Sequence, residues 1–141
     1  MFKDISIKGI AVGSLTVIST SVVLFMLMPL LFWDLIKTGK SDVLITSFWP
    51  QVYTLGVILI SGVFGLYIGT VVANIARWIN SMGIIIISLL ITYIINQPVS
   101  EFASEPTLLF AISNYIACAL SLLLGHFLSK KYINKLKPAL N

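Results

Sequence analysis

Charged side chains are scarce in this sequence, and their absence from four long stretches is its most informative property. Charged residues make up 10% of the 141 residues and hydrophobic residues 58%, whereas a soluble domain carries about 25% charge. The charge-free stretches lie between Lys8 and Asp34, Asp42 and Arg77, Arg77 and Glu101, and Glu105 and Lys130. Each can hold one membrane-spanning helix, because about 20 apolar residues cross a hydrocarbon core roughly 30 Å thick.

Cysteine and histidine are also nearly absent, with one of each in the chain, Cys118 and His126. A single cysteine excludes an intramolecular disulfide and any CxxC redox or zinc pattern. The two residues are eight positions apart on one expected helix, about 12 Å at 1.5 Å per residue, so they cannot form a nucleophile–base pair. Phosphate-loop and HExxH motifs are missing too. We therefore predict that the protein is not an enzyme and needs no cofactor or metal.

The fold expected from these features is all-α: one integral membrane four-helix bundle that spans residues 1–141 as a single domain. Lipid requires the polar backbone groups to be satisfied inside each helix. The Trp49-Pro50 pair is expected to precede the second helix. The predicted helices cover about 9–33, 53–76, 78–95 and 107–128, with a tight turn around 77–82 and a basic cytoplasmic tail over 129–141 that continues the last helix.

The basic residues predict the orientation of the bundle. With the N-terminus in the cytoplasm, seven of them lie inside and two outside, which favours an N-in and C-in topology in a bacterial inner membrane. The chain is then multi-pass. Because the sequence shows no surface that combines basic and aromatic residues, we expect no nucleic-acid partner. The residues expected to meet anionic lipid headgroups are Arg77, Lys130, Lys131, Lys135 and Lys137.

Small residues recur every fourth position on three of the expected helices. Such spacing forms a groove that lets another helix approach closely in lipid. We interpret the stripes as packing of the second and fourth helices inside one bundle, and the alternative is that one stripe faces a second subunit. The residues are Gly9 and Gly13 on the first helix, Ser61, Gly65, Gly69 and Ala73 on the second, and Ser113, Ala117, Ser121 and Gly125 on the fourth.

Polar residues inside the expected spans are mostly hydroxyls, and no ionisable residue lies near a midplane, where proton or ion paths usually place one. Asn114 is expected to donate a hydrogen bond to another helix, and His126 to sit at a helix end wetted by the interface. The candidate polar path comprises Ser14, Thr16, Thr20 and Asn114. Serine and threonine can bond the backbone carbonyls of their own helix, which makes them tolerable in lipid. The alternative is that these hydroxyls form a water-lined face. The third helix carries a thin polar line of Ser88, Thr92 and Asn96.

The segment from Gly62 to Arg77, GVFGLYIGTVVANIAR, resembles one that is common in small bacterial four-helix membrane proteins of uncharacterised function. In those proteins a glycine-rich second helix runs into alanines and an arginine at the cytoplasmic turn. Lys8-Gly9 and Gly13 are similar to their opening helix. The resemblance implies the architecture and carries no activity with it.

Three function classes remain open after this reading. The first is a small structural or accessory subunit that packs against another membrane protein or against itself through the small-residue stripes. The second is a small homo-oligomeric transporter or channel, and a weaker third is a holin-like lesion former. A transporter predicts that the polar residues converge on a hydrated cavity. An accessory subunit predicts that they are buried against helices, with a glycine stripe left facing lipid.

Overall fold

The computed structural model describes residues 5–37, 48–74, 77–96 and 108–136. All regular structure in these ranges is helical, which confirms the all-α prediction. Three helices are long and apolar enough to cross a membrane, and α5, whose apolar part covers Trp78–Ile94, is shorter. The elements are α1 (Ile7–Leu31), α2 (Trp33–Ile36), α4 (Phe48–Ala73), α5 (Trp78–Asn96) and α6 (Leu108–Leu136).

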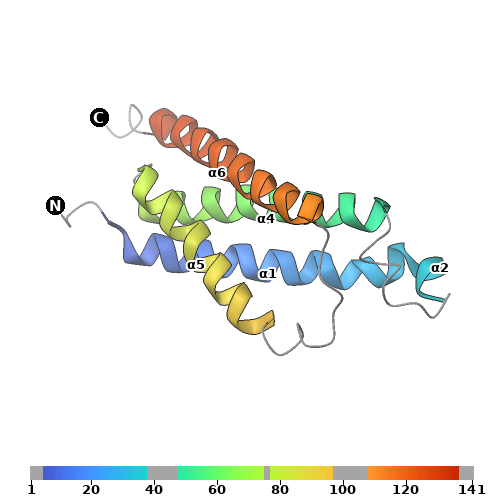
Figure 1. Cartoon of the computed structure of the whole chain (residues 1–141). Helices are drawn as coiled ribbons and strands as arrows, with labels where there is room; N and C mark the ends of the chain where they lie inside the picture. The colour runs from blue at the N-terminus through green and yellow to red at the C-terminus, as the bar shows by residue number, and fades with distance from the viewer. Residues whose placement is uncertain (1–4, 38–47, 75–76, 97–107, 137–141) are drawn as a thin grey trace.

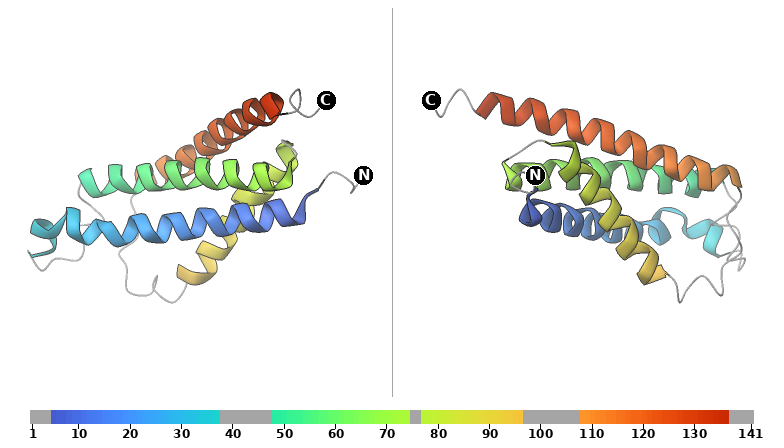
Figure 2. Two further views of the ribbon diagram at one scale, coloured as in Figure 1. Left: turned by 180° about the vertical axis from the view of Figure 1, so that it is seen from behind. Right: turned by 60° about the vertical axis from the view of Figure 1, so that its left-hand side comes forward.

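The central element is α4, which packs against α1 on one side and α6 on the other (Figure 1). Within the described residues α1 and α6 make no contact with each other. The oblique helix α5 crosses this layer and contacts all three of the other long helices (Figure 2). The bundle is therefore a three-helix layer with a fourth helix laid across one face.

The beginning of α1, the beginning of α5 and the end of α6 lie at one end of the bundle, which we call the turn end (Figure 1). At the beginning of α1 the backbone N–H of Ser6 donates a hydrogen bond to Oδ1 of Asn80 on α5 at 3.1 Å. The Oγ of Ser6 in turn accepts from the N–H of Gly9 at 3.1 Å, which satisfies one of the unpaired donors of the first helical turn. The bond between Ser6 and Asn80 joins α1 to α5 through residues that are 74 positions apart in the chain.

The helix expected from about 53 begins five residues earlier, at Phe48. Pro50 was read as a residue ahead of the helix, but it is the third residue of α4 and is buried. Proline is compatible with a first turn, because the N–H groups there have no intrahelical acceptor. The first helix has the expected length but lies two residues earlier: α1 runs from Ile7 to Leu31, and Trp33 opens the separate short helix α2.

The second predicted helix also ends early, at Ala73 instead of 76. Asn74 follows it with a φ of 52°, the left-handed conformation that commonly ends helices and that asparagine tolerates. The tight turn predicted around 77–82 was misplaced, because α5 already begins at Trp78. Arg77 precedes it, and its carbonyl accepts from the N–H groups of Asn80 and Ser81.

The last helix continues through the predicted tail as far as Leu136. Its extension is held against the bundle, because Ile133 is buried and the ring of Tyr132 meets that of Tyr67 on α4 edge-on at 5.4 Å between centroids. The part of the tail from 137 on, including Lys137, lies outside the described residues.

The α1–α4 contact is built from four glycines that bring the two backbones together. A Cβ added at Gly13 would lie 3.0 Å from the carbonyl oxygen of Gly65, and one at Gly69 would lie 2.7 Å from that of Gly9. The Cδ1 atom of Ile84 from α5 would lie 2.7 Å from the first of these Cβ atoms and 2.6 Å from the second. Close backbone approach of this kind is how helices gain van der Waals contact in lipid.

The α4–α6 contact uses a second set of small residues. Gly62 faces Ser121, whose Cβ would be 2.7 Å from a Cβ added at Gly62, and Gly125 faces Leu66, whose Cδ1 would be 2.7 Å away. Ala73 packs on Gly9. Of the other stripe members, Ser61 and Ala117 are buried and Ser113 is half-buried. The stripes on α1, α4 and α6 are thus used between helices of one chain, and the second helix packs most closely on the first.

Candidate functional site

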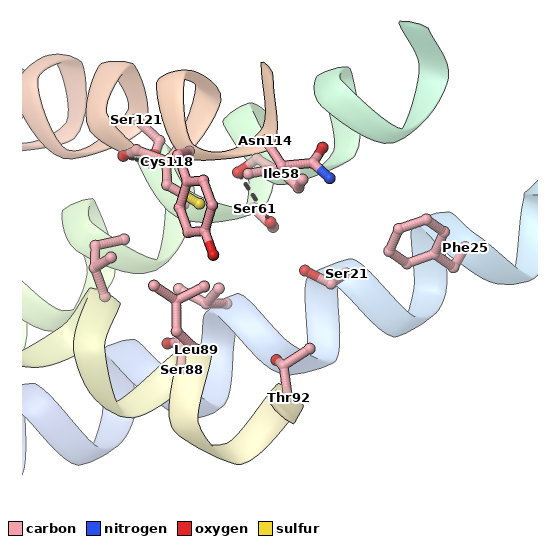
Figure 3. A pocket seen from close by; sticks show the side chains of 14 residues that line it. Ser21, Phe25, Ile58, Ser61, Ser88, Leu89, Thr92, Asn114, Cys118 and Ser121 are labelled. Atoms are coloured by element: carbon pink, nitrogen blue, oxygen red, sulfur yellow. Dashed lines mark hydrogen bonds between the residues drawn. The ribbon is translucent and has the colours of Figure 1, made fainter. Parts of the chain in front are cut away.

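A half-open pocket of about 400 Å³ lies among the four long helices and is lined from each of them, and some of its lining residues, such as Phe25, Leu89 and Tyr115, are exposed. We call it the chamber. Its polar wall consists of Ser21, Ser61, Ser88, Thr92, Asn114, Tyr115, Cys118 and Ser121, and its apolar wall of Val17, Phe25, Ile58, Gly62, Ile85 and Leu89 (Figure 3).

Three buried serines place hydroxyl oxygens on the chamber while donating their protons elsewhere. Ser88 donates to the carbonyl of Ile84 at 2.7 Å, and Ser121 donates to that of Cys118 at 2.8 Å. Ser61 donates to the carbonyl of Ile58 at 3.3 Å (Figure 3). Each carbonyl lies three or four residues earlier in the same helix, the local bond that makes a hydroxyl tolerable in an apolar segment. A serine oxygen keeps two lone pairs, so the three remain acceptors toward the chamber.

Asn114 adds a further acceptor to the wall. Its Oδ1 atom is buried and has no hydrogen-bond partner among the described residues. The donation to another helix that is expected from the Asn114 amide nitrogen stays a prediction, because the unpaired atom is its oxygen. Buried amide oxygens are ordinarily paired, and in this position a water or a bound molecule in the chamber is the natural partner.

The other members of the predicted polar path do not line the chamber. Ser14 is buried and donates to the carbonyl of Ile84 at 3.2 Å, beside an apolar groove between α1 and α5. Thr16 donates to the carbonyl of Val12 at 2.8 Å, its own helix backbone. Thr20 is half-buried and is not among the residues of the chamber wall. Of the four predicted path residues, only Asn114 lines the chamber.

None of the hydroxyl-bearing chamber residues was among the predicted path residues, and Ser21 and Thr92 are two examples. Ser21 lies on the same face of α1 as Val17 and Phe25, four residues to either side. Thr92 follows Ser88 by one turn, so the polar line on α5 indicated this face. The side chain of Asn96 is not described. The polar line on α5 could be seen in the sequence, but the sequence did not show which face of α1 lies opposite that line.

The chamber wall holds no Asp, Glu, Lys, Arg or His. It therefore offers hydrogen-bonding oxygens and apolar surface, without a group that could pair a bound charge. Reaction chemistry also lacks its usual acid and base, since Cys118 has neither a histidine nor a carboxylate beside it in the wall.

At the turn end of the bundle His126 forms a second polar cluster. It was expected in a wetted interface, but it is 2% exposed. Its Nδ1 atom lies 3.0 Å from the Oγ of Ser81, within hydrogen-bond distance. Its ring also stacks on Trp78, with centroids 3.8 Å apart and planes 18° from parallel. Trp78 therefore covers the histidine.

Two further buried hydroxyls, one on α6 and one on α4, meet at a single carbonyl of α4 one turn beyond this cluster. Ser129 donates to the carbonyl of Gly125 at 2.5 Å and approaches that of Leu66 at 3.5 Å. Thr70 donates to the same Leu66 carbonyl at 2.6 Å. The turn end is consequently closed by packed polar groups, while the chamber lies nearer the middle of the spans.

The predicted headgroup residues surround the closed end. Lys130 and Lys131 are exposed on α6, and Arg77 is exposed immediately before α5. Lys8 is exposed at the beginning of α1. The side chain of Lys135 is not described. The opposite end carries an exposed pair in α2 and the turn after it, Asp34 with Lys37, at 3.9 Å.

Comparison with known proteins produced no match to a family model, to a curated protein or to a solved structure.

Proposed function

We propose that this protein is a multi-pass protein of a bacterial inner membrane, with both termini in the cytoplasm, that binds a small polar molecule in the chamber and moves it across the bilayer. The observation that carries the proposal is the chamber itself, a hydroxyl-rich cavity in the middle of otherwise apolar helices. Polar cavities at mid-span are where transporters hold their substrates.

Membrane insertion is supported by the outer surface of the bundle. Large apolar side chains such as Leu15, Met26 and Leu30 are about two-thirds or more exposed, at 68%, 69% and 74%. A contiguous apolar surface of this kind is rare on soluble proteins and is the surface that lipid covers. The cluster of exposed basic residues at the turn end supports a cytoplasmic location for that end.

The accessory-subunit hypothesis relied on a glycine stripe that would face lipid or a partner. The stripe glycines of α4 pack against α1, and the α6 stripe packs against α4. The small residues therefore act within one chain, and the weight moves to the second hypothesis, transport. A homo-oligomer is compatible with this proposal, since Ile60 and Ile116 are examples of large side chains outside the chamber that remain exposed, each at 55%.

The single cysteine makes the proposal directly testable, because Cys118 lines the chamber. The purified protein in proteoliposomes is treated with methyl methanethiosulfonate, a small neutral thiol reagent, and modification is followed by intact-protein mass spectrometry. A hydrated chamber predicts modification of the native protein at a rate within about tenfold of the unfolded protein. Protection of Cys118 in the native state, with full modification after denaturation, would contradict an accessible chamber.

A matched pair of variants distinguishes the chamber from the lipid-facing surface. Ile85 lines the chamber, whereas its neighbour Ile86 is exposed on the outside of α5. Ile85→Trp should fill the chamber and slow modification of Cys118, and Ile86→Trp should leave the rate near that of the parent. Solute flux into the same proteoliposomes should fall with the first variant only. Equal rates in both variants would show that the reagent does not reach Cys118 through the chamber.

A further inference from the structure

We infer that the chamber selects small uncharged molecules that carry hydrogen-bond donors. This inference deepens the proposed function and rests on it. It follows from three properties of the wall: the direction of its hydrogen bonds, its lack of charge and its size.

Four oxygens of the wall act as acceptors toward the chamber, although the hydroxyls of Ser21, Thr92 and Tyr115 and the amide N–H groups of Asn114 can donate. The hydroxyl protons of Ser88 and Ser121 are committed to backbone carbonyls at 2.7 and 2.8 Å. Ser61 makes the same kind of bond at 3.3 Å. The Oδ1 atom of Asn114 cannot donate and has no partner among the described residues. A guest that donates hydrogen bonds satisfies these oxygens, whereas a guest with acceptors alone leaves them unpaired, which is unfavourable in a buried site.

The absence of charge in the wall excludes ions as the favoured guests. None of the lining residues is acidic, basic or histidine. A charged guest at this depth would lose its hydration without gaining a partner of opposite charge, and isolated charges are strongly disfavoured in such surroundings. The wall contains four serines, Ser21 together with the three named above. Their hydroxyl groups are neutral and offer only dipoles to a guest.

The size of the chamber sets an upper limit on the guest. A volume of about 400 Å³ corresponds to roughly a dozen water-sized groups at about 30 Å³ each. The side chains of Phe25, Ile58, Ile85 and Leu89 give the chamber an apolar wall as well. A compact amide or alcohol with a short apolar part fits both sides of the chamber.

The test compares two isomers that differ in donors. Butyramide has two N–H donors, and N,N-dimethylacetamide has the same atoms and the same carbonyl acceptor but no donor. Each is added during modification of Cys118 by methyl methanethiosulfonate in proteoliposomes, and its protecting concentration is measured. We expect butyramide to protect at a concentration about tenfold lower than its isomer, and butyrate, which is charged, to protect least.

Two serine variants assign the preference to the wall. Ser88→Ala removes one chamber oxygen and should reduce the preference for butyramide over its isomer severalfold. Ser19→Ala is the matched control, because Ser19 is exposed and donates to the carbonyl of Thr16 at 3.2 Å, on the outer face of α1. The control should keep the parent preference. The folded state of both variants is checked by the cooperativity of their thermal unfolding.

The outcomes separate the inference from the proposed function. If Cys118 reacts in the native protein but both isomers protect equally, or butyrate protects as well as butyramide, selection for neutral donors is wrong and an accessible chamber remains. An equal change in Ser88→Ala and Ser19→Ala also overturns the assignment to the wall. If Cys118 does not react at all in the native protein, the proposed function and the inference both fail.

Discussion

The Nδ1 atom of His126 lies 3.0 Å from the Oγ of Ser81, and this contact joins α6 to the first turn of α5. Trp78, three residues before Ser81, stacks on the imidazole ring of His126. The neighbouring Asn80 accepts a hydrogen bond from the backbone N–H of Ser6 at the beginning of α1. One turn of α5 thus connects three helices at the turn end and closes the bundle there, whereas the chamber already opens to the surface beside exposed lining residues such as Leu89 and Tyr115.

The His126–Ser81 contact should contribute measurably to stability. Ser81→Ala leaves the imidazole nitrogen buried without its partner, so we expect the free energy of unfolding to fall by about 1 kcal/mol, in the range found for hydrogen bonds inside membrane proteins. Chemical denaturation in mild detergent measures it. His126→Phe alone and combined with Ser81→Ala completes a double-mutant cycle. Additive effects of the two substitutions would show that the pair does not interact.

The glycine contact between α1 and α4 should not tolerate a single methyl group. A Cβ at Gly65 would lie 2.8 Å from the carbonyl oxygen of Gly13 and 3.0 Å from the backbone nitrogen of Val17. Because backbone atoms cannot rotate away, Gly65→Ala should lower the free energy of unfolding by about 1–3 kcal/mol, as overpacking does.

Gly56 is the matched control for this substitution, since it lies on the same helix with nothing within 4 Å of an added Cβ. Gly56→Ala should be neutral or stabilising by up to about 1 kcal/mol, because alanine favours the helix. The two variants are compared by thermal unfolding in the same detergent. If both are equally stable, the α1–α4 backbones are farther apart than described.

Much of the fold follows from spacing that can be seen in the sequence. The four-residue recurrence of Gly65 and Gly69, with Gly9 and Gly13 on the first helix, predicted close packing of small faces. It did not say which faces meet, and the α4 glycines meet α1 where α6 was expected. Spacing on one helix defines a groove, whereas the partner depends on the length and direction of every connection.

The polar groups were harder to assign for a physical reason. A serine on an apolar helix bonds its own backbone whether it faces lipid, another helix or a cavity, so its sequence context is the same in each case. Ser88 bonds its own helix in this way and lines the chamber, whereas Ser14 on α1 donates to the same carbonyl, that of Ile84 on α5, and does not line it. His126 was misassigned similarly, because its burial comes from Trp78, 48 positions earlier.

The far end of the α1–α4 pair should depend on Tyr53. Its hydroxyl donates to the carbonyl of Leu24 at 2.5 Å, and its ring meets Phe32 edge-on at 5.8 Å between centroids. Tyr53→Phe keeps the ring and removes the bond, so the free energy of unfolding should fall by about 0.5–1.5 kcal/mol. Tyr93→Phe is the control on the 66% exposed Tyr93 and should change little. Equal losses would contradict a specific α1–α4 bond.

The orientation of the chain can be read with two engineered cysteines. In a Cys118→Ser background, Asp34→Cys places a thiol at the acidic end and Lys131→Cys places one at the basic turn end; both native side chains are exposed. Because basic residues are retained on the cytoplasmic side, we expect an impermeant sulfonated maleimide to label the first variant in intact cells. The second should react only after the membrane is permeabilised. The reverse pattern would place the turn end outside and require the chamber to be loaded from the opposite side.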